Sequence, residues 1–369
     1  MNSEQVFNPG RLEFARKRRG YKITELSKKL NITTRTYSLF ENGHSEPNDF
    51  FINEISSILK FPVKFFFMED IPPVAVETVS FRSLSRMSAS VRDMAVCASQ
   101  VALEFYSFVE SKFELPNVKL PDLRGVDPEA AAEYVRNEWM IGEKSIRNFI
   151  HLLEAMGCRV FSLNENTNDL DAYSFWMDNK PFVFLNSKKS VEHSRFDCAH
   201  ELGHLVLHKH GGPRGKEAET EANRFASSFL MPEGSVRAIV DRYPTLPRLI
   251  SLKRNWLVSV SALSRRLKDL SLLTDWQYRS LMIEISKRGF LKREPDPIEH
   301  RETSQLLPMI FNALKEYGFS KRIIADKLGV HAIDIDALMF NLTVLNIVEG
   351  NGSNKNISKR NTNHLRQIK

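Results

Sequence analysis

The sequence of 369 residues is long enough for two or three folded domains, each with its own apolar core. Its composition, 42% hydrophobic and 26% charged, is typical of a globular protein and excludes a wholly disordered chain. The formal net charge of +7 permits polyanionic partners without requiring them.

Two further features indicate where the protein acts. No stretch approaches 18 consecutive apolar residues, and the first 20 residues hold no apolar run before their basic cluster, so we expect neither export nor a membrane partner. The three cysteines, Cys97, Cys158 and Cys198, are too few and too far apart for a disulfide framework. We therefore expect a cytoplasmic protein in a reducing compartment.

Residues 7–69 are expected to form the first domain, built from short helices separated by polar turns. Between residues 11 and 35 there are nine basic and two acidic residues, a local net charge of +7. One helix is expected to end at Leu30 and the next at residues 41–43, with a turn at residues 31–33 between them. Thr33 can cap the N-terminus of the second helix.

The segment RLEFARKRRGYKITELSKKLNITTRTYSLFENGHSEP resembles the Xre/Cro-type helix-turn-helix family, over about residues 9–66. The resemblance implies a domain that binds double-stranded DNA, with its second helix in the major groove. Base edges would be met near the N-terminus of that helix, by Thr34, Arg35, Thr36 and Ser38. Phosphate contacts, which set affinity and salt dependence, would come from Arg16, Lys17, Arg18, Arg19, Lys28 and Lys29.

An isolated module of this kind usually binds DNA weakly, so we expect a homodimer on two half-sites. The alternative is a helix-turn-helix that is kept for protein contact or dimerisation.

The rest of the chain divides by composition. Residues 70–126 are expected to form a helical connector, residues 127–235 a second domain and residues 236–291 a helical extension of it. In the second domain, helices at 128–139 and 144–156 precede strands at 158–163, 172–177 and 182–186, which should form a small antiparallel sheet. A helical unit at 300–348 and a disordered basic tail at 349–369 complete the chain. The expected fold class is α+β, predominantly helical.

The helical unit at 300–348 contains a second helix-turn-helix rhythm, in ALKEYGFSKRIIADKLGVHAIDIDALM. We expect it to be a packing or partner-binding unit rather than a second DNA reader.

The most informative string of the second domain is RFDCAHELGHLVLHKH, which places an HExxH pattern on an expected helix. His200 and His204 are one turn apart and can bind the same zinc ion. Glu201 can accept a proton from a water that the metal polarises and later deliver it to a leaving amine.

A catalytic zinc requires a third protein ligand, and the sequence offers His208, His210, Glu217, Glu219 and Glu221. His208 lies two turns beyond His200 and cannot reach the same ion from a straight helix, so it is expected to pack or to support a ligand. His210 has the metzincin spacing, but Leu207 stands where that family turns the chain with glycine. Residues 211–218 can instead turn the chain into a second helix, on which Glu219 can bind the metal while Asn223 supports a ligand. Glu221 stays a lesser candidate.

The pair AHELGHLVLH and ETEANRFASSFLMP resembles the ImmA/IrrE family of zinc metallopeptidases. The resemblance extends back to about residue 128 and covers about 110 residues. It implies that His200, His204 and Glu219 bind zinc, that Glu201 is the catalytic base and that the substrate is a protein, because members of this family cleave helix-turn-helix repressors.

Taken together, these features predict a transcriptional regulator that binds DNA and cleaves a protein, such as a partner repressor, through a zinc-dependent peptidase domain. A substrate segment could add as a strand to the sheet near residues 182–186. The alternative is a non-catalytic repressor or antitoxin of a toxin-antitoxin pair, whose metal domain binds a toxin or another protein partner.

Overall fold

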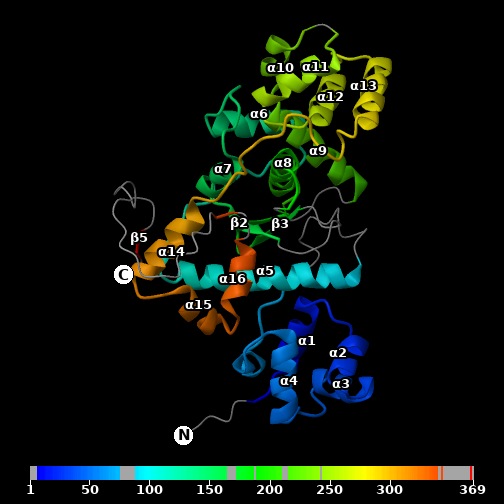
Figure 1. Ribbon diagram of the computed structural model, residues 1–369. Helices are drawn as coiled ribbons and strands as arrows, with labels where there is room; N and C mark the ends of the chain where they lie inside the picture. The colour runs from blue at the N-terminus through cyan, green and yellow to red at the C-terminus, as the bar shows by residue number, and fades with distance from the viewer. Residues whose placement is uncertain are drawn as a thin grey trace, which may run out of the picture.

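The computed structural model describes residues 6–74, 88–163, 172–186, 188–209, 215–241, 243–339, 342–343 and 366–367. Within these ranges the protein is predominantly helical, with a three-stranded sheet near its middle (Figure 1). The expected class, α+β with helices dominant, is confirmed. All three cysteines are buried free thiols, as their spacing predicts. No helix in this part of the chain is both long and apolar enough to cross a membrane.

The N-terminal domain consists of four α-helices and a 3-10 helix. Asn8 caps α1 and Pro9 occupies its first turn, a position where a missing N–H costs nothing. Thr33 caps α3, as predicted, by accepting a hydrogen bond from the backbone N–H of Thr36. The bounds are α1 Pro9–Arg18, α2 Ile23–Lys29, α3 Thr34–Glu41, α4 Asp49–Leu59 and η1 Val63–Phe67.

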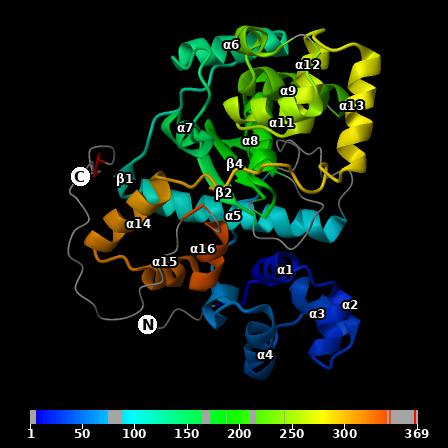
Figure 2. The ribbon, with the colours of Figure 1, turned by 45° about the horizontal axis from the view of Figure 1, so that its top comes forward.

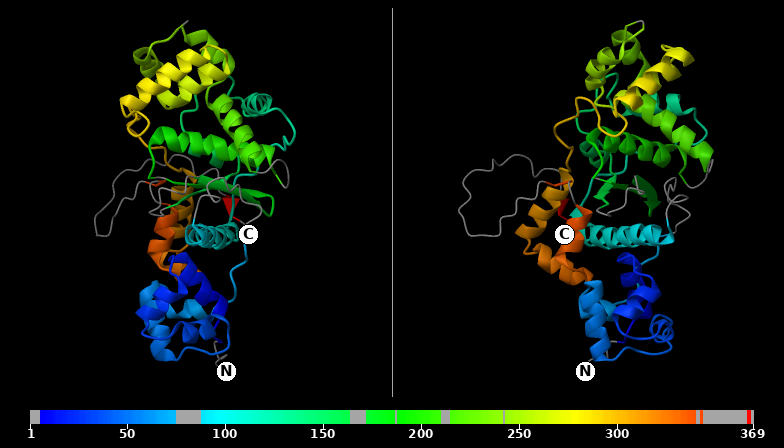
Figure 3. Two further views of the ribbon diagram at one scale, coloured as in Figure 1. Left: turned by 90° about the vertical axis from the view of Figure 1, so that its right-hand side faces the viewer. Right: turned by 45° about the vertical axis from the view of Figure 1, so that its right-hand side comes forward.

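The long helix α5 (Ala89–Glu110) lies between the N-terminal domain and the sheet (Figures 1 and 3). On one side, the Arg11 guanidinium of α1 lies 3.6 Å from Glu104 of α5, and the Ser90 hydroxyl donates to the carbonyl of Gly20. On the other side, the Tyr173 hydroxyl of the sheet donates to the carbonyl of Ala95. Residues 75–87 of the predicted connector lie outside the described residues.

The sheet contains β2 (Arg159–Ser162), β3 (Ala172–Met177) and β4 (Lys180–Leu185), close to the predicted strands, in the order β2-β4-β3. The predicted antiparallel sheet is wrong in one respect, because β2 pairs with β4 in parallel while β3 and β4 are antiparallel. The turn at Asp178 and Asn179, both with positive φ, joins β3 and β4 as a hairpin, and β4 is central because it also pairs with β2. No tight turn joins β2 to β4, since β3 lies between them in the sequence, so parallel pairing of these two strands is possible.

Side chains alternate along β3, so one face of the sheet meets α5 and the opposite face meets α8 (Val191–Leu207). Tyr173 and Phe175 face the side of α5 and stack with the rings of β4. Ser174 and Trp176 face α8, where the Trp176 indole N–H donates to the carbonyl of Leu205. The sheet therefore forms the floor on which α8 lies.

Helices α6, α7 and α9 pack against α8, while α12 packs on α9 and contacts α11 and α13. The predicted helix at 144–156 is shorter in the structure, since Asn148 caps α7 and the helix begins at Phe149. The bounds are α6 Pro128–Glu138, α7 Phe149–Ala155, α9 Lys216–Leu230, α10 Glu233–Ile239, α11 Leu246–Leu252, η4 Lys253–Asn255, α12 Val260–Asp269 and α13 Asp275–Lys287.

The C-terminal unit contains α14 (Leu306–Glu316), α15 (Lys321–Leu328) and α16 (Ala332–Leu338), and it packs beside the C-terminal half of α5 (Figure 2). Phe311 stacks on Phe105, and Phe319 meets Phe108 edge to face. Of the predicted tail 349–369, only β5 (Arg366–Gln367) is described, and it pairs with β1 (Phe113–Glu114).

Candidate metal centre and DNA interface

Helix α8 carries the HExxH pattern in its buried half. Ser190 caps the helix, and every residue from Asp197 to Leu207 is buried between the sheet and the covering helices. His200 and His204 lie one turn apart, and their Nε2 atoms are 3.1 Å from each other. The helix therefore presents both imidazoles to the same point.

Helix α9 brings the third group to that point. Glu219 Oε2 lies 3.3 Å from His200 Nε2, and Glu219 Oε1 lies 3.4 Å from His204 Nε2. Within the described ranges these three are the only group of histidine, cysteine or acidic residues whose ligand atoms converge, all within 4.8 Å of one another. Ligand atoms about 2.0–2.1 Å from a tetrahedral zinc are separated by roughly 3.3 Å, so this donor set fits zinc without rearrangement.

A glycine allows α9 to approach α8 closely enough. A Cβ atom at Gly203 would lie 3.1 Å from Cδ1 of Phe225 and 3.3 Å from Cα of Ala222, both on α9. These separations are tighter than ordinary van der Waals contact, so a side chain at position 203 would push the helices apart. The glycine within the HExxH pattern therefore positions Glu219.

Hydrogen bonds orient both imidazoles. Asn223 Oδ1 lies 3.1 Å from His200 Nδ1, which leaves Nε2 of that ring for a metal. His204 Nδ1 lies 2.9 Å from His208 Nδ1, and His208 Nε2 lies 2.9 Å from Glu221 Oε2. Asn223 thus lies where the sequence predicts a supporting residue. Glu221, the lesser candidate for third ligand, contacts His208 instead of joining the cluster.

The protonation states of the cluster suit metal binding. Burial alone would raise the pKa of Glu219, but hydrogen bonds with His200 and His204 lower it to about 2. Burial lowers the pKa of His204 to about 4. Burial also acts to lower the pKa of His200, but the hydrogen bond with Glu219 and the nearby carboxylates raise it above its ordinary value. Near neutral pH, Glu219 is ionised and His204 is neutral, which are the forms that bind metals.

Glu201, the predicted base, is buried beside the cluster. Its carboxylate contributes to the raised pKa of His200, so the two groups are close. Its Oε2 accepts a hydrogen bond of 2.7 Å from the hydroxyl of Ser174 on β3. Ser174 is not among the residues that the sequence predicts for the site. The available signal was a single hydroxyl in the otherwise apolar strand AYSFWM, on the face that meets α8.

The other sequence candidates do not join the cluster. Glu217 is exposed on the first turn of α9. His210 and the first half of the turn at 211–218, namely residues 211–214, lie outside the described residues.

The N-terminal domain presents part of the predicted DNA surface. Thr34 and Arg35 are exposed in the first turn of α3, whereas Thr36 and Ser38 are half-buried. Lys28 and Lys29 are exposed at the end of α2, and the Lys29 ammonium lies 5.7 Å from the centre of the Tyr21 ring. These side chains surround the N-terminus of α3, where a base-reading helix makes its contacts.

Three of the predicted phosphate contacts are engaged inside the protein. The Arg16 guanidinium binds the carboxylate of Glu41, with its Nε 2.6 Å from Oε1. Arg18 is buried. Arg19 donates to the carbonyls of Leu59 and Lys60 and to Asp334 of α16. The structure gives these arginines packing partners and lends no support to the prediction that they contact phosphates.

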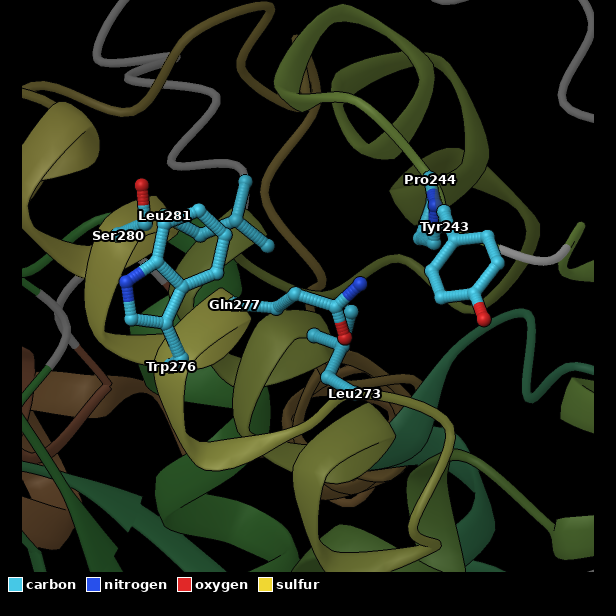
Figure 4. A pocket seen from close by; sticks show the side chains of 7 residues that line it. All are labelled: Tyr243, Pro244, Leu273, Trp276, Gln277, Ser280 and Leu281. Carbon is cyan, nitrogen blue, oxygen red and sulfur yellow. The ribbon is translucent and has the colours of Figure 1, made fainter.

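A small pocket of about 140 Å³ lies apart from both sites, between α13 and the segment before α11 (Figure 4). Its walls contain no carboxylate, imidazole or ammonium group. The lining residues are Tyr243, Pro244, Leu273, Trp276, Gln277, Ser280 and Leu281.

Comparison with known families matches both parts of the chain. Residues 12–66 match the helix-turn-helix family model, and residues 153–268 match a peptidase family model described as IrrE N-terminal-like domain. The second match contains the whole cluster and includes part of the predicted extension at 236–291. No curated protein matches the chain. The two matches confirm the predicted combination of a helix-turn-helix domain with an ImmA/IrrE-type domain.

Proposed function

We propose that this chain, in which a helix-turn-helix domain is joined to an IrrE N-terminal-like domain, is a DNA-binding transcriptional regulator with a zinc-dependent peptidase activity. The observation that carries the peptidase half is the convergence of His200, His204 and Glu219 within 4.8 Å, with Glu201 buried beside them. The helix-turn-helix match and the exposed first turn of α3 support the DNA-binding half. A protein that reads chromosomal DNA would act in the cytoplasm.

Zinc fits this donor set, with two imidazole nitrogens and one carboxylate as protein ligands. A bound zinc ion would supply a Lewis acid that polarises the scissile carbonyl and acidifies water. The Glu201 carboxylate would accept the proton of the attacking water and pass it to the leaving amine. Ser174 would hold one oxygen of that carboxylate and so fix its direction.

The observed strand order changes the strand to which we expect a substrate segment to add. Residues 182–185 belong to β4, which is the central strand and has both edges paired, so the predicted strand addition there is wrong. The β2 side of the sheet is packed by α7 and α16, whereas β3 lies against the helix that carries the cluster. An extended segment of the substrate would therefore add along β3.

The substrate we propose is a partner repressor, and the test uses the protein encoded in the neighbouring reading frame. The zinc-loaded full-length chain is incubated with that protein, and intact masses are recorded over time. The Glu201→Gln variant is the control, because it retains the ligands and lacks the base. New fragments with the unmutated chain alone would support the proposal.

The same experiment distinguishes cleavage of the partner from binding without catalysis. A stable complex with no fragments from either chain would contradict cleavage and favour a regulator or antitoxin that binds its partner without catalysis.

A further inference from the structure

We infer that Glu221, acting through His208, is a positioning residue for the metal ligand His204. The inference rests on the proposed function, because it assigns to these two side chains the support of a zinc ligand. The structure places the three groups in series, with separations of 2.9 Å from His204 Nδ1 to His208 Nδ1 and 2.9 Å from His208 Nε2 to Glu221 Oε2.

The metal ligand at one end of this series and the carboxylate at the other determine which nitrogen of each imidazole carries the proton. If His204 offers the lone pair of Nε2 to a metal, its proton must reside on Nδ1. Nδ1 of His208 must then accept, which leaves the His208 proton on Nε2. The Glu221 carboxylate can only accept, so it matches that proton. Every donor in the series has one acceptor, and the two imidazole tautomers are fixed together.

The fold explains why His208 can take this role. Helix α8 ends at Leu207, and His208 leaves the helical conformation with φ −121° and ψ 19°. Its backbone N–H still bonds to the carbonyl of His204, so the two rings stay adjacent. The His208 side chain is only 10% exposed and that of Glu221 32%, which limits replacement of either group by water.

Helix α9 thereby supports both histidines of α8 by different routes. Asn223 contacts Nδ1 of His200 directly. Glu221 reaches Nδ1 of His204 through His208, and Glu219 completes the cluster. A single helix supplies a ligand and orients the other two ligands.

Zinc affinity of the full-length chain, measured by chelator competition, tests the inference. Loss of a group that orients a metal ligand typically costs 10–100-fold in metal affinity. We expect Glu221→Ala to weaken zinc binding by about that factor and Glu221→Gln to restore most of the affinity, because its amide oxygen can accept from His208 Nε2. Glu217→Ala, which removes an exposed carboxylate from the same helix, is the matched control and should bind zinc like the unmutated chain.

A second readout guards against a change of fold. With cobalt in place of zinc, the visible absorption of Glu221→Ala should shift relative to Glu217→Ala, while the thermal unfolding temperatures of the two metal-free variants agree. Equal zinc affinities and equal cobalt spectra in the two alanine variants would overturn the inference, as would equal losses in Glu221→Ala and Glu221→Gln. Failure of the unmutated chain to bind zinc is a different result, since it would contradict the proposed function itself.

Discussion

At the scale of single residues, the proposed metal ligands and the proposed base are different side chains of the cluster. His200, His204 and Glu219 point their ligand atoms at one another, whereas the carboxylate of Glu201 is held by Ser174. Because these roles belong to different side chains, substitution can remove one and leave the other.

Substitution of Glu201 should therefore affect catalysis alone. We expect Glu201→Gln to lower peptide hydrolysis by about 10²- to 10⁴-fold, the usual contribution of a general base, with zinc content unchanged. Hydrolysis rates and metal analysis of the same sample would check this. Loss of zinc in the variant would mean that Glu201 has been assigned the wrong role.

Some residues of the site can be predicted from the sequence and others cannot. His200, His204, Glu219 and Asn223 follow from spacing, because each pair lies one turn apart on its helix. The contact of Glu221 with His208 joins different helices and depends on the end of α8, which no local pattern specifies. The packed position of Arg19 is equally hard to predict, because its partners Leu59 and Asp334 lie on α4 and α16.

At the scale of elements, the site depends on how closely two helices and a sheet approach. The spacing between α8 and α9 is set at Gly203, where even a methyl group would crowd Phe225 and Ala222. The sequence predicts both helices and all three strands within a few residues. It could not predict the strand order, because that depends on which strand of a hairpin pairs with β2.

The close approach of the helices can be tested by adding one methyl group. Alanine is the better helix former, so both Gly203→Ala and Gly234→Ala gain about 1 kcal/mol of propensity. At position 234 the added Cβ meets only the flexible side chain of Glu143. We expect Gly203→Ala to lower zinc affinity and thermal stability, with an overpacking cost of about 1–3 kcal/mol, while Gly234→Ala does neither. Indistinguishable zinc affinities would contradict the role of Gly203.

Helix α3 and the end of α2 should differ in how they contact DNA. With an operator selected from random duplexes, Arg35→Ala should lose about 1–3 kcal/mol on that operator and relax its sequence preference. Lys28→Ala should weaken all duplexes similarly and reduce the slope of log affinity against log salt by about one. Fluorescence anisotropy across a salt series measures both. An equal loss of affinity for all duplexes in Arg35→Ala would show that Arg35 does not contact bases.

At the scale of the whole molecule, the two domains belong to one packed body. A single cluster of buried apolar side chains runs from Phe7 to Leu342. The C-terminal unit joins the domains. Asp334 of α16 binds Arg19 of the N-terminal domain, and Leu306, the first residue of α14, donates its backbone N–H to Glu154 of α7. The buried Asp334 of α16 and the contacts of Phe311 and Phe319 with α5 support the prediction that this unit packs within the protein.

The junction at Glu154 should contribute to the stability of the whole chain. Its buried carboxylate accepts hydrogen bonds from the hydroxyl of Ser304 and from the backbone N–H groups of Gln305 and Leu306. Glu154→Ala leaves these donors without an acceptor, and we expect a loss of about 1–3 kcal/mol in unfolding free energy and faster proteolysis near residue 304. Denaturant unfolding and limited proteolysis check this. Unchanged stability would show that the C-terminal unit docks independently of Glu154.

The proposed metal centre is tested most directly by the metal content of the purified full-length chain beside its Glu219→Ala variant. We expect about one zinc per chain in the unmutated protein and a large loss in the variant, because Glu219 is one of the three residues whose ligand atoms converge in the described part of the chain. Absence of zinc from the unmutated protein after reconstitution, or equal zinc in both proteins, would contradict the proposed metal centre.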